Sequence, residues 1–154
     1  MKKLLLIFGI LFCGFAFSQP PPAVAMPNSN QQKLIDEFLV VSNYKQSIQE
    51  YSFTFLYSKM RKTIDGKSVS VLDKKDLESI VQNFDFEKFK KYSVYNAFSQ
   101  ISENNLKAMI GFYKSINGNL NNRNDIFFIN QVINNNLTSQ LNQMANEIIK
   151  KKGF

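Results

Sequence analysis

Few residues in this chain could do chemistry, because it has no histidine and only one cysteine, Cys13. Zinc sites, Ser-His-Asp triads, Cys-His pairs and histidine proton relays all depend on one of these two residue types. Carboxylates are therefore the side chains left that could serve as general acid and base. Three pairs of them lie close in sequence: Asp36 with Glu37, Asp73 with Asp76, and Asp85 with Glu87.

Each carboxylate pair falls at a predicted helix start or on a polar helix face. Glycoside hydrolysis needs two carboxyl groups that face each other across a cleft, which spacing within one helix does not provide. Asp73 and Asp85 are better interpreted as helix caps. The segment 65–67 lacks the alternating oxygen ligands of a calcium loop. We therefore predict no catalytic residue, no metal site and no cofactor, and a carboxylate-based hydrolase stays as the remote alternative.

The N-terminal residues predict export. A basic start at residues 1–3 precedes the apolar run 4–17, and Ala16 and Ser18 supply small side chains at the −3 and −1 positions of a cleavage site. This pattern is typical of a secretory signal peptide, and the apolar run is too short for a transmembrane span. The predicted signal peptide is 1–18, which directs the protein to the periplasm or out of the cell.

Lipidation is the alternative for the same segment, since acylation takes place on a cysteine that ends such a run. Phe12 disfavours it, because the residue before Cys13 would have to be small. Residues 19–29 contain all four prolines of the chain and are predicted to be a disordered leader. Residues 30–154 are long enough for a single helical domain with a core of its own.

Charge and aromatic content indicate possible partners. The formal net charge is +7, of which Lys2 and Lys3 in the signal peptide contribute two. The remaining excess is modest and favours solubility, but it also suits an anionic surface. Phe86 to Tyr92 interleaves aromatic and basic residues as single-stranded nucleic-acid binders do. Export argues against nucleic acid as a partner, so we interpret these aromatics as core residues.

Apolar residues that recur every three or four positions predict most of the helices. The first spans about 30–41 and breaks at Ser42-Asn43, and a loop is predicted over 63–70, where Asp65-Gly66 favours a turn. The final helix has about 25 residues and carries a long apolar stripe. Its members are Ile126, Ile129, Ile133, Leu137, Leu141, Met144 and Ile148.

The end of the final helix carries the candidate contacts to an anionic membrane surface or envelope polymer. These are Lys150, Lys151 and Lys152, followed by Gly153 as a cap residue. Cations at a helix C-terminus also complement the helix dipole, so a solvated helix end explains the triplet without any partner. We keep the anionic-surface role as the second hypothesis.

Three helix starts share one motif, the hydrophobic staple. In this motif the apolar residue before the N-cap packs on a second apolar residue at position N4 of the helix. The three sets are Leu72, Asp73 and Leu77; Phe84, Asp85 and Phe89; and Ile101, Ser102 and Leu106. Helices are therefore predicted to begin near residues 73, 85 and 102. Their short connections predict that consecutive helices lie antiparallel.

The stretch from Tyr44 to about Lys62 is apolar on two opposite sides. Ile48, Tyr51 and Phe55 define one face. A helix with two apolar faces must be covered on both or leave one open as a binding groove. The second face, the candidate partner-binding face, consists of Phe53, Leu56, Tyr57 and Met60. The alternation in 51–55 also fits a strand, but helical flanks favour a helix.

The helix that starts at Ser102 has Leu106, Met109, Ile110 and Tyr113 on one face and Gly118 beyond its end. Its Ser-Glu start followed by Leu-x-x-Met-Ile-x-Phe-Tyr-x-Ser-x-x-Gly resembles the signature of the domain-of-unknown-function 2059 family, small exported bacterial proteins. Asn105 and Ile116 stand where that pattern often has an acidic residue and a proline.

The resemblance is strongest over about 95–120, with a family-like core of about 95–150, and implies a helical fold outside the cytoplasm without assigning an activity. Phe112 and Tyr113, at the centre of the motif, are further candidate contacts to a partner, although core packing is the favoured interpretation of Tyr113.

These observations together predict an all-α fold of five or six helices, with the Ser102 helix and the final helix paired as a C-terminal α-hairpin. The leading hypothesis for function is a non-enzymatic protein that binds a partner protein or peptide in the cell envelope through an apolar groove. Peripheral binding to a membrane or envelope polymer through the basic C-terminal helix is the alternative.

Overall fold

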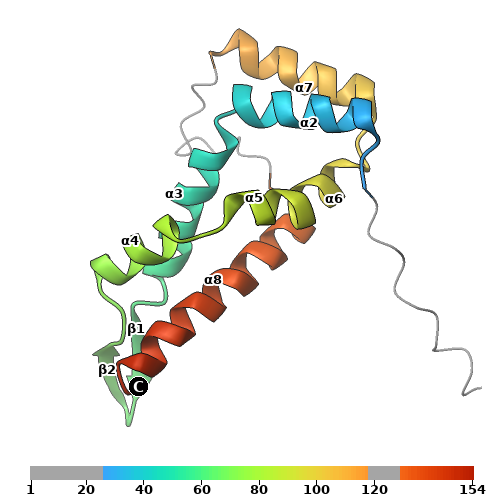
Figure 1. The fold of residues 1–154 in the computed structure, drawn as a ribbon. Helices are drawn as coiled ribbons and strands as arrows, with labels where there is room; N and C mark the ends of the chain where they lie inside the picture. Colours follow the sequence, from blue (N-terminus) through green and yellow to red (C-terminus); the bar gives the residue numbers. More distant parts are fainter. Residues whose placement is uncertain (1–25, 118–128) are drawn as a thin grey trace, which may run out of the picture.

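The computed structural model describes residues 26–117 and 129–154, of which 70% are helical. Six helices and one two-stranded sheet make up this part of the chain (Figure 1). The elements are α2 (Ser29–Val41), α3 (Tyr44–Tyr57), β1 (Arg61–Ile64), β2 (Lys67–Ser70), α4 (Lys74–Gln82), the continuous run of α5 (Phe86–Phe89), η1 (Lys90–Val94) and α6 (Tyr95–Phe98), then α7 (Glu103–Ser115) and α8 (Gln131–Lys151). The predicted helical class is confirmed, but the fold is not strictly all-α.

Several sequence predictions fall on other parts of the chain. The signal peptide 1–18, residues 19–25 of the leader, Gly118 and Ile126 lie outside the described residues. The first described helix begins at Ser29, one residue before the predicted domain boundary, because Asn28 caps it. The Asn28 side chain accepts from the backbone N–H of Gln31, and the Gln31 side chain accepts in return from the backbone of Asn28.

The three predicted helix starts are confirmed. Asp73, Asp85 and Ser102 are the N-caps of α4, α5 and α7. Each side chain accepts a hydrogen bond from the backbone N–H three residues later, at 3.1, 2.9 and 3.3 Å respectively. Such a bond satisfies a donor that the first helical turn leaves unpaired. In the second staple the rings of Phe84 and Phe89 lie 5.3 Å apart, as the spacing predicts.

The run from Phe86 to Phe98 contains a π-helical turn, η1, that the sequence did not predict. The Tyr95 N–H donates to the carbonyl of Lys90, five residues back, so this turn holds one more residue than an α-helical turn. Ser93 and Val94 in the turn are buried, and the Asn136 side chain of α8 donates to the Ser93 hydroxyl at 3.1 Å. Turns of this kind are often found at functional sites.

The final helix is shorter than predicted. Near its C-terminus, the buried residues differ from the predicted ones. Asn130 caps α8, its side chain accepting from the N–H of Ile133 at 2.9 Å. Ile133, Leu137 and Leu141 are fully buried as predicted. Beyond them Ala145 and Ile149 are the buried residues, while Met144 and Ile148 are only partly covered. A straight helix drifts relative to a fixed apolar repeat, which accounts for the change of face.

The loop predicted over 63–70 is wrong, because β1 and β2 form an antiparallel hairpin there. The predicted extension of α3 to Lys62 is wrong for the same reason, since α3 ends at Tyr57. Asp65 and Gly66 both have positive φ, at 50° and 74°, which is the conformation of a two-residue hairpin turn. Almost every side chain of the two strands is exposed, so the strands lack the apolar alternation that reveals a half-buried sheet.

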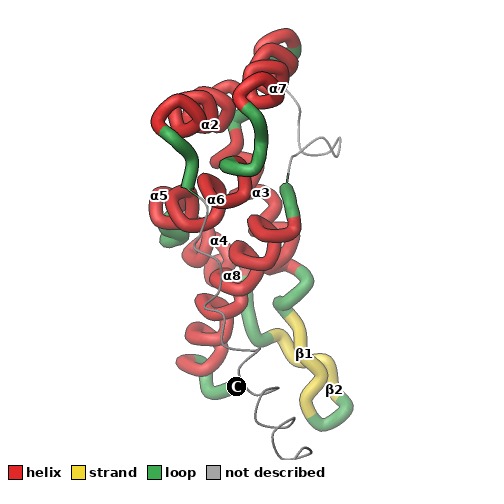
Figure 2. Tube along the Cα trace, turned by 90° about the vertical axis from the view of Figure 1, so that its right-hand side faces the viewer, coloured by secondary structure: helices red, strands yellow, loops and turns green. Residues whose placement is uncertain are grey.

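The helices form two groups, which are joined by contacts between α2 and α3 and by the run that contains η1 (Figures 1 and 2). α2 and α7 pack side by side as one group, and α3, α4 and α8 pack on one another as the other. The run α5–η1–α6 contacts α2 through α6 and α8 through η1. The predicted α-hairpin of α7 with α8 is therefore wrong. The long chain between Ser115 and Gln131 lets α8 start far from α7, whereas only a short connection forces neighbours together.

An aromatic cluster at the centre of the first group joins four elements. The Phe38 ring of α2 has no exposed surface. It lies 5.9 Å from the ring of Tyr44, 5.2 Å from Phe98 and 5.4 Å from Tyr113, which stands edge-on to it at 82°. Such geometries are favoured between aromatic rings, and they tie α2 to α3, α6 and α7. Gln31 adds a polar link, since its side chain donates to the carbonyl of Ser99 at 3.1 Å.

An ion pair fixes the C-terminal end of α8 to the start of α4. The Lys152 ammonium lies 3.1 Å from Asp73 Oδ2 and also donates to the Asp76 carboxylate. The backbone N–H of Asp76, followed by the hydrogen bond from Lys152, lowers the pKa of Asp73. The hydrogen bond to Asp76 is the main cause that raises the pKa of Lys152. Lys152 thus pairs with both carboxylates of a helix cap.

We expect this ion pair to contribute stability in a defined range of pH. A carboxyl group with a lowered pKa stabilises the fold above its unfolded value of about 4, and a lysine with a raised pKa stabilises it below about 10. Lys152→Met should therefore melt slightly below the wild type at neutral pH, and the difference should shrink as acid protonates Asp73. Thermal melts from neutral pH to pH 3 measure this, with exposed Lys151→Met as the control. Equal melting of both variants at neutral pH would show that the pair contributes nothing.

Candidate functional site

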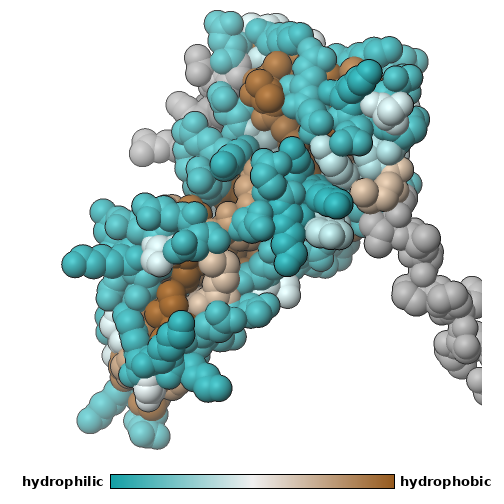
Figure 3. Space-filling model, in the orientation of Figure 1, coloured by the Kyte–Doolittle hydropathy of each residue, from teal (hydrophilic) through white to brown (hydrophobic). Residues whose placement is uncertain are grey.

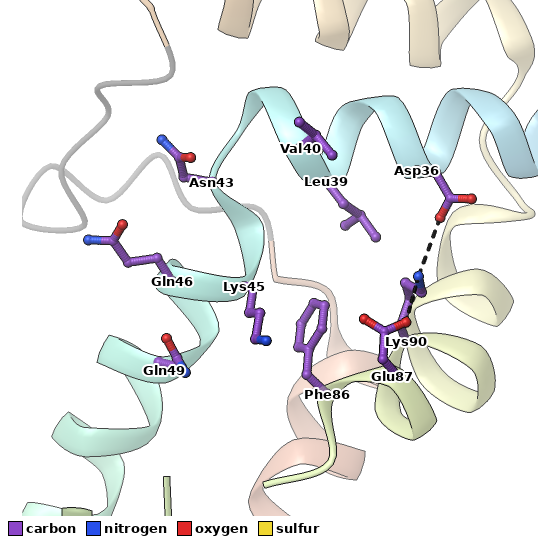
Figure 4. A pocket seen from close by; sticks show the side chains of 10 residues that line it. All are labelled: Asp36, Leu39, Val40, Asn43, Lys45, Gln46, Gln49, Phe86, Glu87 and Lys90. Atoms are coloured by element: carbon purple, nitrogen blue, oxygen red, sulfur yellow. Dashed lines mark ion pairs between the residues drawn. The ribbon is translucent and has the colours of Figure 1, made fainter. Parts of the chain in front are cut away.

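A cleft with a volume of about 490 Å³ lies between α2, α3 and α5 (Figure 4). Residues from all three helices and from η1 line it. They are Asp36, Leu39, Val40, Asn43, Lys45, Gln46, Gln49, Phe86, Glu87 and Lys90. The α3 side carries amides, the opposite side carries charges, and apolar side chains lie between them.

Lys90, the first residue of η1, organises the charged side of the cleft. Its ammonium lies 2.8 Å from Glu87 Oε2 and 3.8 Å from Asp36 Oδ1, so it links α2 to the α5–η1 run. The Tyr95 hydroxyl donates to Asp36 Oδ1 at 2.7 Å and accepts from the Gln32 amide at 3.3 Å. Figure 4 shows Lys90 between the two carboxylates.

The protonation states in this group support a fixed arrangement. The hydrogen bond to Glu87 is the main cause that raises the pKa of Lys90, against the opposing effect of burial. Burial, and then the hydrogen bond to Asp36, raise the pKa of the Tyr95 hydroxyl. Lys90 therefore stays a cation and Tyr95 stays a hydrogen-bond donor at neutral pH.

The apolar part of the cleft combines buried and open side chains. Leu39 and Phe86 are almost fully buried, whereas Val40 is 75% exposed. Figure 3 shows hydrophobic atoms gathered over the C-terminal half of α2 on a face that is otherwise mostly hydrophilic. The Lys45 ammonium lies 5.8 Å from the centre of the Phe86 ring, in the range of a cation–π contact. No carboxylate of the described residues pairs with Lys45.

A second cleft, of about 640 Å³, lies on the other side of the Lys90 group. Glu87 and Lys90 line both clefts, so this ion pair separates them. Met26 and Tyr92 on its walls are both more than half exposed. The surface around η1 is thus hollowed on two sides, with a charged ridge between the hollows.

The predicted partner-binding face of α3 does not form an open patch. Leu56 has no exposed surface and lies on the same buried face as Ile48 and Ser52. Phe53 and Met60 are partly covered by the core, and only Tyr57 stands out, at 72% exposed. The prediction that Leu56 belongs to a binding groove is wrong, because α4 and α8 pack against α3 and cover that side.

The two aromatic candidates of α7 differ in their exposure to solvent. Tyr113 is buried against Phe38, and burial raises the pKa of its hydroxyl. Phe112 is 47% exposed, with its ring 5.5 Å from that of Tyr113. The favoured interpretation of Tyr113 as a core residue is confirmed, and Phe112 alone of this pair is accessible to a partner.

The three lysines at the end of α8 differ in their interactions. Lys150 and Lys151 are exposed, but Lys152 is held by the carboxylates of Asp73 and Asp76. The structure therefore assigns Lys152 to the attachment of α8 and leaves two of the three predicted cations free for an anionic surface. Gly153 has φ 83° and ends the helix as predicted.

Sequence reasoning missed the cleft itself. Val40 carried a usable signal, because it is an apolar residue off the stripe that contains Ile35 and Phe38. An apolar side chain outside the buried face of a helix is a candidate for contact with a partner. The interleaved aromatic and basic residues of 86–92 were noticed in the sequence, but their proximity to Lys45 could not be, since folding brings together positions that are about 40 residues apart.

Two carboxylates, Asp36 and Glu87, converge at this cleft, and both face the ammonium of Lys90. Within 26–117 and 129–154, no group of three metal-binding side chains converges. None of the helices in these ranges combines the length and the apolar character needed to cross a membrane.

Comparisons of the chain with protein-family models, with curated proteins and with solved structures find no match. The resemblance to the domain-of-unknown-function 2059 family thus stays a prediction from the Ser102 motif.

Proposed function

We propose that this is an exported, non-enzymatic protein of the cell envelope that binds a peptide segment of a partner protein in the cleft between α2, α3 and α5. The observation that carries the proposal is the composition of that cleft, which is lined by exposed Val40 and by unpaired Lys45 beside buried Phe86. Export rests on the predicted signal peptide, so the proposal places the partner outside the cytoplasm.

Each part of the cleft has a role in this proposal. Val40 and the edge of Phe86 would cover one apolar side chain of the peptide, which removes apolar surface from water. Lys45 would pair with an acidic side chain or a terminal carboxylate. The amides of Gln46 and Gln49 on α3 can both donate to and accept from a peptide backbone. The preferred ligand is therefore an extended segment with an apolar residue next to an acidic one.

Val40→Glu is expected to weaken the binding of such a peptide at least tenfold, which corresponds to about 1.4 kcal/mol. The new carboxylate would stand on the apolar surface and repel the acidic group of the ligand. Because Val40 is so exposed, the substitution should leave the fold intact. The measurement is fluorescence anisotropy of peptides selected from a displayed random library on the wild-type protein.

Val132→Glu on α8 is the matched control, since Val132 is also an exposed valine but does not line the cleft. Lys45→Glu should weaken binding as Val40→Glu does, and should select basic peptides instead of acidic ones. The proposal fails if the library yields no peptide, or if Val132→Glu weakens binding as much as Val40→Glu.

A further inference from the structure

The β-hairpin stands out from the helical body and buries almost nothing. β1 and β2 lie at the lower end of the molecule, away from the α2–α7 group (Figures 1 and 2). Seven of the eight strand residues are exposed, and Val69 is the partly buried one. An isolated two-stranded hairpin is at best marginally stable in water. Its presence on the surface is therefore not explained by packing of a hydrophobic core.

The hairpin and its flanks are strongly basic. Residues 59–70 hold four cations and a single carboxylate, Asp65. The cations are Lys59, Arg61, Lys62 and Lys67, all with exposed side chains. Arg61 is oriented along the sheet, because its Nε donates to the Ser68 hydroxyl at 2.9 Å and its guanidinium also donates to the Ser68 carbonyl. The positive charge of the hairpin is thus presented on a defined backbone.

The C-terminal lysines extend this basic surface. The ion pair of Lys152 with Asp73 joins the end of α8 to the residues that follow β2. Figures 1 and 2 both place the C-terminus and the hairpin at the same end of the molecule. Exposed Lys150 and Lys151 therefore lie at the end of the molecule that carries the hairpin, and the cap carboxylates of α4 already have a cationic partner.

Apolar side chains are exposed among these cations. Ile64, the last residue of β1, is 37% exposed, and Phe154 at the end of the chain is 52% exposed. Figure 3 shows hydrophobic atoms among hydrophilic ones at this end. Cations that surround exposed apolar side chains are typical of surfaces that bind the headgroup region of an anionic membrane. The phosphates of a nucleic acid could also pair with these cations, but a nucleic acid would not explain the exposed apolar side chain of Ile64.

We propose that the β1–β2 hairpin and the C-terminal end of α8 form one surface that binds an anionic phospholipid bilayer, with lysines on the headgroup phosphates and Ile64 and Phe154 between the headgroups. This surface is separate from the α2–α3–α5 cleft. When this surface binds lipid, the protein is held at the membrane. The cleft then stays accessible to a partner, because it is not part of the lipid-binding surface.

Co-sedimentation with vesicles tests the proposal. The wild-type protein is expected to bind vesicles of phosphatidylcholine mixed with phosphatidylglycerol. It is expected not to bind vesicles of phosphatidylcholine alone. Lys62→Glu/Lys67→Glu should lower the partition coefficient at least tenfold, since each basic residue near an anionic membrane contributes about a factor of five. Added salt should weaken wild-type binding, because it screens charges on an exposed surface.

The matched control is Lys33→Glu/Lys107→Glu, which makes the same change of net charge on exposed lysines of α2 and α7. This control should keep wild-type binding. Phe154→Ser should weaken binding without any change of side-chain charge, as insertion of the ring requires. Circular dichroism should show unchanged helix in all three variants.

The proposal is overturned if the wild-type protein does not bind the anionic vesicles. It is also overturned if the Lys33/Lys107 control loses binding as much as the hairpin variant, because net charge alone would then explain the result. Binding to a DNA oligonucleotide that depends on Lys62 and Lys67, in the absence of vesicle binding, would assign the surface to a polyanion and not to lipid.

Discussion

Phe38→Ala is expected to lower the free energy of unfolding by about 3–5 kcal/mol, the range for removal of a fully buried phenylalanine ring. Phe38 has no exposed surface and contacts the rings of Tyr44, Phe98 and Tyr113. The substitution leaves a cavity where α2, α3, α6 and α7 meet. Since domains of this size are stable by about 5–15 kcal/mol, the variant should unfold well below the wild-type temperature or fail to fold.

Urea denaturation followed by circular dichroism measures this effect. Tyr57→Ala is the matched control, because Tyr57 is an aromatic residue that is 72% exposed and should change the stability by less than about 0.5 kcal/mol. A double-mutant cycle of Phe38 with Tyr113 tests the pairing of α2 with α7 and should give a coupling of about 0.5–1.5 kcal/mol. Additive effects of the two substitutions would contradict that pairing.

Leu141→Ala should destabilise the other group of helices by about 2–5 kcal/mol. Leu141 is fully buried in the middle of α8, the helix that packs on α3, α4 and η1. Neighbouring Gln140 is exposed, so Gln140→Ala should be nearly neutral in the same urea titration. If both variants unfold at the wild-type urea concentration, α8 does not bury the face that the structure assigns to it.

The starts of the helices could be predicted from the sequence because capping is local. Asp73, Asp85 and Ser102 each bond to a backbone group three residues away, so a short window of sequence contains both partners. The buried face of each helix was predictable for the same reason, since an apolar stripe repeats within one element.

The partners of the helices were not predictable in the same way. The stripe of Leu106 and Ile110 shows that α7 buries one face, but that face is equally suited to α2 or α8. The hairpin was missed because its strands are exposed and so have no buried side to give them a pattern. The π-helical turn was missed because one additional residue in a turn changes hydrogen bonding without a change in composition.

The candidate cleft depends on contacts between distant parts of the chain. Folding brings Lys90 of η1 to Asp36 of α2, and Lys45 of α3 to the ring of Phe86 of α5. The face of α3 that the sequence singled out failed as a site because a stripe of apolar residues does not reveal whether another helix covers it. Burial of Leu56 required knowledge of where α4 and α8 lie.

The π-helical turn also has a consequence for how the length of this chain can vary. The turn of Lys90–Val94 closes over five residues and so holds one residue more than an α-helical turn. Loss of a single position there would restore ordinary winding and leave Phe89 and Phe98 facing their present neighbours, whereas loss of a position inside α8 would rotate everything after it by about 100°. Homologous chains that differ by one residue in this region are therefore expected to align with their gap inside 90–94.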